Sequence, residues 1–294
     1  MNIIVCVKPV PDVSIITVDP KTGLIDSDDL VYIINPYDVV AVEEALRIKE
    51  RDGAGHVIVI SVAPPSMRRL LRRCLAMGAD EARLLWDNSF ENLDSYATGV
   101  ILSKAIDSLQ YDIILCGQKA IDTEAGQVGS VIAERLDLPL VSRVTGIDIL
   151  PDDKKVTVES KLEKGKRAEV EVALPAVLTV DVELNEPRYT SLPSLMAGLR
   201  SDIEEYNLET LALSRQELSP KGTMTTTIEL STPKPRPKKV FTPDSSLPAE
   251  ERLRLIMSGG VIQKQGDMLV GDPAKIASSV VQSLSERKIL SIEL

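Results

Sequence analysis

The first half of the chain alternates short apolar runs with longer stretches in which apolar residues recur at helical spacing. Continuous apolar runs are typical of strands buried on both faces of a sheet. Runs of this kind predict strands at residues 3–7, 56–62, 82–86 and 112–117. The intervening stretches predict helices at residues 38–51, 64–77, 94–109 and 126–136. This alternation predicts an α/β fold with a parallel, doubly wound sheet that is covered by helices on both sides.

The pattern changes after Pro139. Three stretches, 144–150, 155–161 and 167–172, alternate apolar and charged residues as the strands of an exposed antiparallel hairpin extension do. An apolar run at 176–182 indicates one more buried strand. A proline-punctuated loop at 185–193 and a short helix at 194–203 complete this region.

The C-terminal quarter has a different composition. Residues 219–243 are rich in Thr, Pro and Lys, which favours an extended linker. Helical patterns follow at 248–257 and 272–288, but this tail is too small for a good core of its own. We therefore predict one α/β domain over residues 1–218 and a C-terminal arm over residues 219–294 that packs on another surface.

Composition excludes several classes of function. The 294 residues carry 34 Lys and Arg against 44 Asp and Glu, a formal net charge of −10, which argues against nucleic acid as a partner. Three cysteines without a Cys-x-x-Cys motif exclude a disulfide framework and a zinc knuckle, and the single histidine, His56, excludes a multi-histidine metal site. No signal peptide and no apolar run near ~18 residues is present, so a soluble, cytoplasmic protein is expected.

Candidate chemistry lies at the predicted strand ends, because ligands of doubly wound sheets bind beyond the carboxyl ends of the strands. The strand ending at Cys116 continues into a loop with Gly126 and Gly129, just where a helix is predicted to begin. Glycines let the backbone approach a ligand, and a helix start offers free N–H groups to an anion. Neither G-x-G-x-x-G nor G-x-x-x-x-G-K-[ST] is present. The spacing alone leaves two interpretations open: a phosphate-binding loop, or an ordinary strand-to-helix loop.

Four segments, in this order, resemble the β subunit of electron-transfer flavoproteins. They are residues 5–8 (VCVK), 35–38 (NPYD) with 41–47 (AVEEALR), 116–122 (CGQKAID) running on to 127–129 (QVG), and 184–193 (LNEPRYTSLP). Residues 75–80 and 174–177 fit as well, so the resemblance covers roughly residues 1–205. Several long motifs in one order are far more specific than a single glycine pattern.

The resemblance implies a heterodimer with an α subunit that holds a redox-active FAD. The C-terminal arm of this chain would wrap around that α subunit. This chain would bind an adenine nucleotide, which is AMP in the ordinary carriers and a second FAD in electron-bifurcating relatives. With a second FAD, NADH would reduce that flavin. One of the two electrons of the reduced flavin would then go to a high-potential acceptor and the other to a low-potential, ferredoxin-like acceptor. No catalytic residue and no metal site is implied. The nucleotide-binding residues carried over are Cys6, Lys8, Asn35, Pro36, Tyr37, Asp38, Val62, Cys116, Gly117, Ala120, Ile121, Asp122, Thr123, Gly126, Gln127, Val128 and Gly129.

Within this set, Asn35 and the strand-end backbone suit adenine and ribose, and residues 126–128 suit phosphates. Ordinary carriers tend to have Asn-Gln-Thr where this chain has Gly126-Gln127-Val128, so no hydroxyl reaches a terminal phosphate and no side chain closes the pocket. The usual bifurcating pattern has Gly-Asp-Thr where this chain has Thr123-Glu124-Ala125. The match to the bifurcating form is imperfect, but FAD is favoured, with AMP as the alternative.

The loop before Leu192 has a second role in the family, because it docks the carrier onto an acyl-CoA dehydrogenase with a leucine as anchor. Leu195, Met196 and Leu199 follow Leu192 at near-helical spacing. We expect Leu192 to dock and at least one of the other three to pack in the core.

Two other hypotheses stay open. Arg68, Arg69, Arg72 and Arg73 place like charges at i,i+4 on one predicted helix, at a cost of ~0.2–0.5 kcal/mol per pair. A solvated face is favoured for these arginines, with an acidic partner surface as the alternative, and a structural role is favoured for His56.

A different class of function is a stand-alone adenine-nucleotide sensor or ATP-using enzyme, which would be a monomer or homodimer without flavin.

Overall fold

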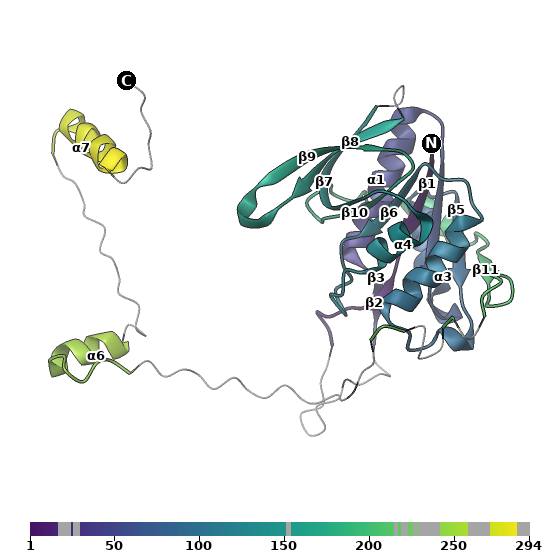
Figure 1. Cartoon of the computed structure of the whole chain (residues 1–294), viewed down its shortest axis with the longest axis horizontal. Helices are drawn as coiled ribbons and strands as arrows, with labels where there is room; N and C mark the ends of the chain where they lie inside the picture. Colours follow the sequence, from purple (N-terminus) through teal and green to yellow (C-terminus); the bar gives the residue numbers. More distant parts are fainter. Residues whose placement is uncertain are drawn as a thin grey trace. The chain divides into compact units, whose positions relative to one another are not determined.

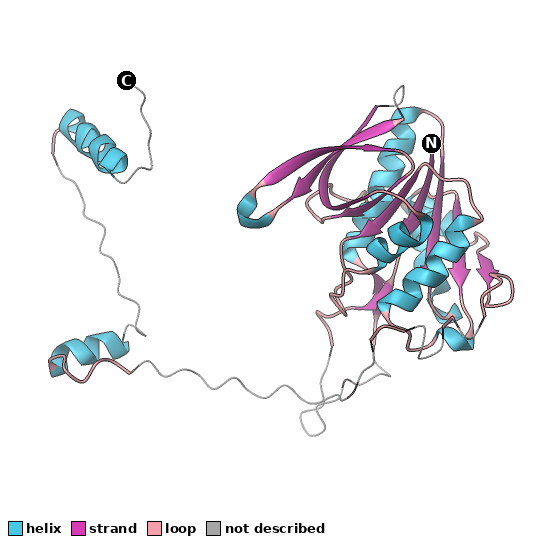
Figure 2. Ribbon diagram, viewed as in Figure 1, coloured by secondary structure: helices cyan, strands magenta, loops and turns pink. Residues whose placement is uncertain are grey.

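The computed structural model describes residues 1–16, 25, 30–150, 154–214, 217–218, 223–225, 228, 242–257 and 271–286 (Figures 1 and 2). It divides into two compact units, Met1–Thr232 and Pro233–Leu294, and each is described by itself. The linker predicted at 219–243 lies largely outside the described residues.

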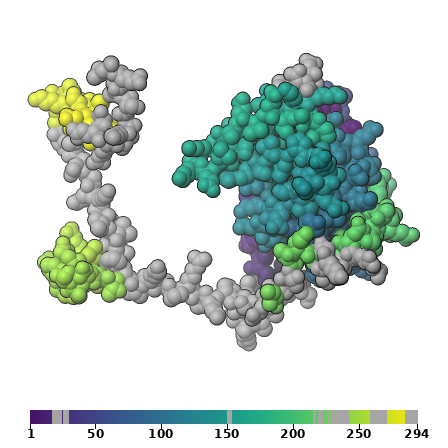
Figure 3. All heavy atoms as spheres, viewed as in Figure 1, coloured from purple at the N-terminus to yellow at the C-terminus, as the bar shows by residue number. Residues whose placement is uncertain are grey.

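A nine-stranded sheet forms the centre of the first unit, in the order β11-β5-β4-β1-β6-β10-β7-β8-β9. The strands from β11 to β7 are parallel, and β8 and β9 add antiparallel to them. This confirms the predicted doubly wound α/β fold and its antiparallel extension, and in Figures 1 and 3 the hairpin of β8 and β9 extends away from the rest of the unit. The strands are β1 (Asn2–Cys6), β4 (His56–Val62), β5 (Glu81–Leu85), β6 (Ile113–Gly117), β7 (Leu140–Leu150), β8 (Lys155–Lys161), β9 (Arg167–Ala173), β10 (Ala176–Val180) and β11 (Glu204–Tyr206), with β2 (Pro9–Pro11) and β3 (Tyr32–Ile34) as a separate antiparallel pair.

Helices cover both faces of this sheet, and the alternation of side chains along each strand supplies a core to each face. Val5 of β1 packs in the core on the α1 and α2 side, together with Leu46. Ile4, its neighbour, packs on the opposite side with Ile101 of α3. The helices of this unit are α1 (Pro36–Asp52), α2 (Arg68–Met77), α3 (Ser95–Asp107), α4 (Val128–Leu136) and α5 (Leu192–Gly198).

Local element bounds differ from the predictions at two helices. The helix expected at 64–77 begins with a 3₁₀ turn, Pro65–Met67, before α2 starts. The helix expected at 194–203 begins earlier, as α5, because the Ser191 hydroxyl caps its first turn by accepting a hydrogen bond from Ser194 N at 3.3 Å, and it ends at Gly198. The chain then adds the short edge strand β11, whose sequence Glu-Glu-Tyr carries no strand periodicity.

The second unit contains two described helices, α6 (Ala249–Met257) and α7 (Pro273–Glu286), where helical patterns were predicted. Leu253, Ile256 and Met257 lie at i, i+3 and i+4 of α6 and are exposed. None of the helices in the described ranges is long and apolar enough to cross a membrane.

Candidate functional site

The sheet contains a topological switch point between β1 and β6. From β1 the chain passes through α1 to β4 on one side, and β6 pairs with β1 on the other side. The helices that follow the two strands therefore lie on opposite faces of the sheet, and in such folds ligands bind beyond the strand ends at this point. We call the region beyond the carboxyl ends of β1 and β6 the crevice. The residues carried over from the family resemblance gather at this edge.

Asp38 joins the two strand ends. Its carboxylate accepts hydrogen bonds from the backbone N–H of Lys8, just after β1, at 2.7 Å and from that of Gly117, at the end of β6, at 3.1 Å. The amide of Asn35 donates to the same carboxylate at 2.9 Å. Asp38 is buried in the first turn of α1, so this helix, β1 and β6 are held in one fixed arrangement.

Asn35 holds the loop that follows β6. Its side-chain nitrogen also donates to Lys119 O at 2.9 Å, its side-chain oxygen accepts from Ile121 N at 3.2 Å, and its backbone N–H donates to Lys8 O at 2.9 Å. The side chain is buried. Asn35 therefore shapes the crevice through the backbone around it, rather than offering free polar atoms to a ligand.

The loop from Gln118 to Gln127 forms the outer wall of the crevice. Its charged side chains are paired. Asp122 binds Lys8, which follows β1, with N···O distances of 2.6 and 2.9 Å, and Lys119 binds Glu124 at 2.7 Å. Gly126 has φ +60°, and a Cβ built there would lie 3.2 Å from Gln118 O, so a glycine suits this bend.

The start of α4 faces the end of this loop. Gln127 precedes the helix without a side-chain cap, so the first-turn N–H groups at Val128 and Gly129 have no partner within the helix. A Cβ on Gly129 would lie 2.5 Å from the methyl group of Thr179 on β10, which keeps the helix start close to the sheet. Free N–H groups at a helix start are where anions bind in proteins, and phosphate binding by this loop stays a prediction.

The floor of the crevice is made by the last residues of the strands. Cys6 and Cys116 are register partners on β1 and β6, and both are buried free thiols. The hydrogen bond with Cys6, together with burial, raises the pKa of the Cys116 thiol well above its ordinary value. The Cys116 thiol is therefore uncharged at neutral pH.

The remaining carried-over residues occupy several positions around this crevice. Val62 ends β4 beside β1 and is half-buried, and Tyr37 lies against Gly117. Pro36 starts α1 and is exposed, and Thr123 lies in the exposed outer loop. Thr179 also lies beside Gly129 but was not among the predicted residues, because this position depends on the pairing of β10 with β6.

The segment before Leu192 is anchored on α1. The Arg188 guanidinium binds Glu43 at 2.8 Å and Glu50 at 2.5 Å, and the Asn185 amide donates to Glu44 at 2.9 Å. Burial alone would raise the pKa of Glu43, but hydrogen bonds from Arg188 and Arg47 outweigh it and hold that pKa below its ordinary value. The carboxylate is therefore charged at neutral pH and fixes the loop.

Leu192 is 69% exposed, as expected for a docking residue. The expectation that at least one of Leu195, Met196 and Leu199 packs in the core is wrong. Met196 is 50% and Leu199 38% exposed, and Leu195 is only half-buried. The reason is that α5 uses its smallest residue, Gly198, for its close contact with α2.

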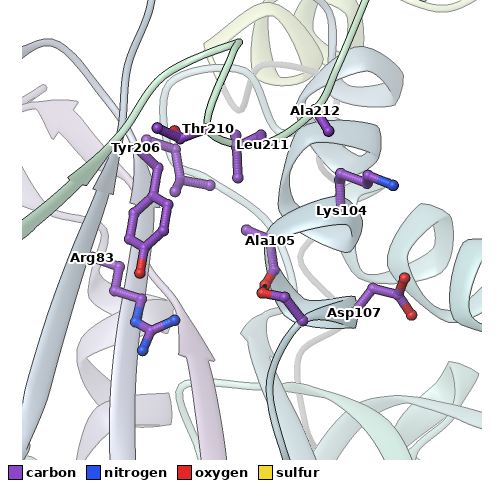
Figure 4. Close-up of a pocket in the computed structure, with 10 residues that line it drawn as sticks. Arg83, Lys104, Ala105, Asp107, Tyr206, Thr210, Leu211 and Ala212 are labelled. Carbon is purple, nitrogen blue, oxygen red and sulfur yellow. Dashed lines mark hydrogen bonds between the residues drawn. The ribbon is translucent and has the colours of Figure 1, made fainter.

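A separate cavity of about 250 Å³ lies between β5, β11 and α3 (Figure 4). Arg83 lies over the ring of Tyr206 on one wall, 5.5 Å from its centroid, and Lys104 and Asp107 of α3 lie on the other. Arg83 is also paired with Glu81 at 3.1 Å. None of the carried-over residues lines this cavity, and its arginine is already neutralised.

The protonation of Asp38 makes the stability of the folded chain depend on pH. Burial raises its pKa to about 7, against hydrogen bonds from Asn35, Lys8 and Gly117 that lower it. Since this pKa is higher in the folded than in the unfolded chain, the stability it contributes is complete below pH about 4 and is lost as the pH rises through 7.

Asp38→Asn does not titrate, so the stability that it loses with one hydrogen-bond acceptor is the same at every pH. We therefore expect the free energy of unfolding of the wild type to fall relative to that of the variant as the pH rises from about 4 to about 7. The slope should be at most about 1.4 kcal/mol per pH unit. Urea denaturation at four pH values measures this difference, and a difference independent of pH would contradict it.

Comparison with known proteins places these features in context. A family model described as electron transfer flavoprotein domain matches residues 22–211. A protein named electron transfer flavoprotein subunit beta, from Thermoanaerobacterium thermosaccharolyticum, is 43% identical over 244 residues, 82% of this chain and 92% of that protein. Subunit CarD of the caffeyl-CoA reductase-Etf complex of Acetobacterium woodii is 37% identical over 292 residues, 99% of this chain and 100% of CarD. The electron transfer flavoprotein subunit beta of Megasphaera elsdenii is 33% identical over 297 residues, again with 99% and 100% coverage, so both alignments include the second unit.

Proposed function

This chain belongs to the electron transfer flavoprotein family as a β subunit, and from this premise we propose that it pairs with an FAD-holding α subunit and carries electrons between a dehydrogenase and other redox partners. The observation that carries the proposal is the crevice at the switch point, where Asp38 joins the ends of β1 and β6. The cysteines are free, which suits a reducing compartment, and we place the heterodimer in the cytoplasm.

We propose that the crevice holds an adenine nucleotide. Its phosphates would be bound by the first-turn N–H groups of α4, because Lys8 is already paired with Asp122. The buried thiols of Cys6 and Cys116 would lie beneath the nucleotide. Asn35 and Asp38 would position the surrounding backbone rather than contact the nucleotide with free polar atoms.

We favour FAD over AMP as this nucleotide. Val128 has no hydroxyl to close over a terminal phosphate, and Gly126 has no side chain, so the pocket stays open for a pyrophosphate that leads on to a flavin. A bound FAD would supply the chemistry for accepting electrons from NADH, and a ferredoxin-like protein would then be the low-potential acceptor. This chain's part is to bind and orient the nucleotide.

The test is to co-express the chain with its α subunit, denature the purified complex and quantify the released nucleotides by chromatography. Two FAD and no AMP per heterodimer would support a second flavin and lead to an NADH assay. One FAD and one AMP would leave a single-flavin carrier. A stable chain without heterodimer or flavin would overturn the carrier function and favour the nucleotide sensor or ATP-using enzyme.

We propose that the second unit is an arm that packs on the α subunit. The exposed apolar residues Leu253, Ile256 and Met257 of α6 support this, because such a face needs a partner surface. The first unit has its own two-sided core and does not need the arm to fold.

Deletion of residues 233–294 should therefore leave the first unit folded but weaken its affinity for the α subunit by at least about tenfold. Analytical ultracentrifugation of the co-expressed subunits measures this loss. Deletion of residues 271–294 alone should give a smaller loss, because α6 is retained. An undiminished heterodimer after the longer deletion would contradict the arm.

A further inference from the structure

Arg143 lies at an irregular point of the central sheet. The pairing of β7 with β10 shifts register between Val141 and Val144, and Arg143 lies within this interval. Its φ is 56°, in the left-handed region that favours glycine over residues with a side chain. Bulges and unfavourable backbone conformations occur where the direction of a side chain matters. The arginine at this position therefore points to a use for its side chain.

The guanidinium of Arg143 has no acceptor among the described residues. The residue is half-buried and its Nε is buried, yet Nε–H finds no hydrogen-bond acceptor and no ion pair forms in that part of the chain. A buried cation without a partner is costly, so we expect its acceptor to be a bound group. The other half-buried arginines in the described part of the first unit all have a partner: Arg68 has Glu205, Arg72 has Ser201 O, Arg83 has Glu81 and Arg188 has Glu43.

The backbone places Arg143 close to the start of α4. The N–H of Arg143 donates to Thr179 Oγ1 at 3.3 Å. The methyl group of the same threonine would lie 2.5 Å from a Cβ built on Gly129, in the first turn of α4. Only Thr179 therefore separates Arg143 from the helix start, where the first N–H groups have no partner within the helix. An arginine side chain is long enough to span such a gap.

Two lysines near this end of the sheet are already paired. Lys161 forms an ion pair with Glu183, and Lys119 binds Glu124 at 2.7 Å. The hydrogen bond with Glu183 raises the pKa of Lys161, while the charge of Arg143 acts to lower that pKa, so the two cations are close together. Unlike these lysines, Arg143 keeps its full charge available to an anion.

We propose that the Arg143 guanidinium binds a phosphate of the adenine nucleotide, next to the first-turn N–H groups of α4. A planar guanidinium donates two parallel hydrogen bonds to phosphate oxygens, which the backbone of a helix start cannot do alone. The helix start contributes partial positive charge and Arg143 a full one. This inference rests on the proposed nucleotide binding and adds a phosphate-binding side chain to it.

The test uses the purified heterodimer and, as the probe, the FAD or AMP that the wild type releases beyond the one FAD of the α subunit. Arg143→Gln removes the charge, and Arg143→Gly also removes the conflict with the left-handed backbone. Arg135→Gln is the control, because it removes an exposed cation from the last turn of α4 and changes the net charge equally. Equilibrium dialysis gives the Kd of the probe, and urea denaturation gives the free energy of unfolding.

We expect Arg143→Gln and Arg143→Gly to raise this Kd by about 10- to 100-fold, the loss typical of one charged hydrogen bond. Arg135→Gln should change it by less than about twofold, because exposed charges act weakly at a distance. Arg143→Gly should be no less stable than the wild type, since glycine suits this backbone, so its weaker binding is not a folding defect.

Three outcomes would overturn the inference in different ways. A wild type that binds the probe, with Arg143 variants of equal Kd, would exclude phosphate binding by Arg143 and leave nucleotide binding intact. Arg143 variants that keep the probe but separate from the α subunit would assign the guanidinium to the subunit interface. A wild type that holds no nucleotide beyond one FAD would overturn the proposed nucleotide binding and this inference with it.

Discussion

Replacing Gly117 with alanine is expected to release most of the nucleotide from the crevice and to lower the free energy of unfolding by about 2–4 kcal/mol. A Cβ at this position would lie 2.1 Å from the Asp38 carboxylate and 2.8 Å from Cβ of Tyr37. The Asp38 carboxylate is held in place by hydrogen bonds from Lys8 N and the Asn35 amide, and Cβ of Tyr37 is fixed to the backbone of α1. The added methyl group must push α1 away, which breaks the bond between Asp38 and Lys8 N.

The nucleotide content of the purified heterodimer and urea denaturation measure the two effects. Gly146→Ala is the matched control, since its Cβ would lie 3.3 Å from Cβ of Glu159, an outward-facing residue of a hairpin strand. Asp38→Gly removes the clashing carboxylate, so its combination with Gly117→Ala should cost less than the sum of the two single changes. Full nucleotide occupancy in the Gly117→Ala heterodimer would show that the crevice is not the binding site.

The parallel strands of the sheet were predictable because their signal is local. Residues 3–7 and 112–117 are apolar at nearly every position, as a strand covered on both faces must be, and the structure places β1 and β6 there. The edge strand β11 lacked this signal, since an edge position does not require apolar residues on both faces. Its pairing with β5 depends on contacts about 120 residues away in sequence, which no local pattern encodes.

The members of the crevice could be named from their motifs, but their roles depend on long-range geometry. Asn35 was expected to contact adenine and ribose, and its polar atoms instead bind Lys119 O and Ile121 N. A sequence does not reveal whether a buried amide faces a ligand or the backbone of another strand. The anchoring of Arg188 by Glu43 likewise joins residues separated by 145 positions.

Leu192→Ala is expected to slow electron transfer between the dehydrogenase and the heterodimer by about 30-fold or more, the loss typical of an interface hot spot worth ~2 kcal/mol. The free energy of unfolding should not change by more than about 0.5 kcal/mol, because the side chain is already 69% exposed in the folded chain. The loss should persist at high ionic strength, since an apolar contact is not screened by salt.

Leu162→Ala is the matched control, because Leu162 is also an exposed leucine, at 45%, but lies at the turn between β8 and β9. It should leave the rate unchanged. Equal rates for both variants and the wild type would mean that Leu192 does not anchor the dehydrogenase. A loss of rate for Leu192→Ala at all ionic strengths, beside an unchanged rate for Leu162→Ala, requires an apolar anchor at Leu192.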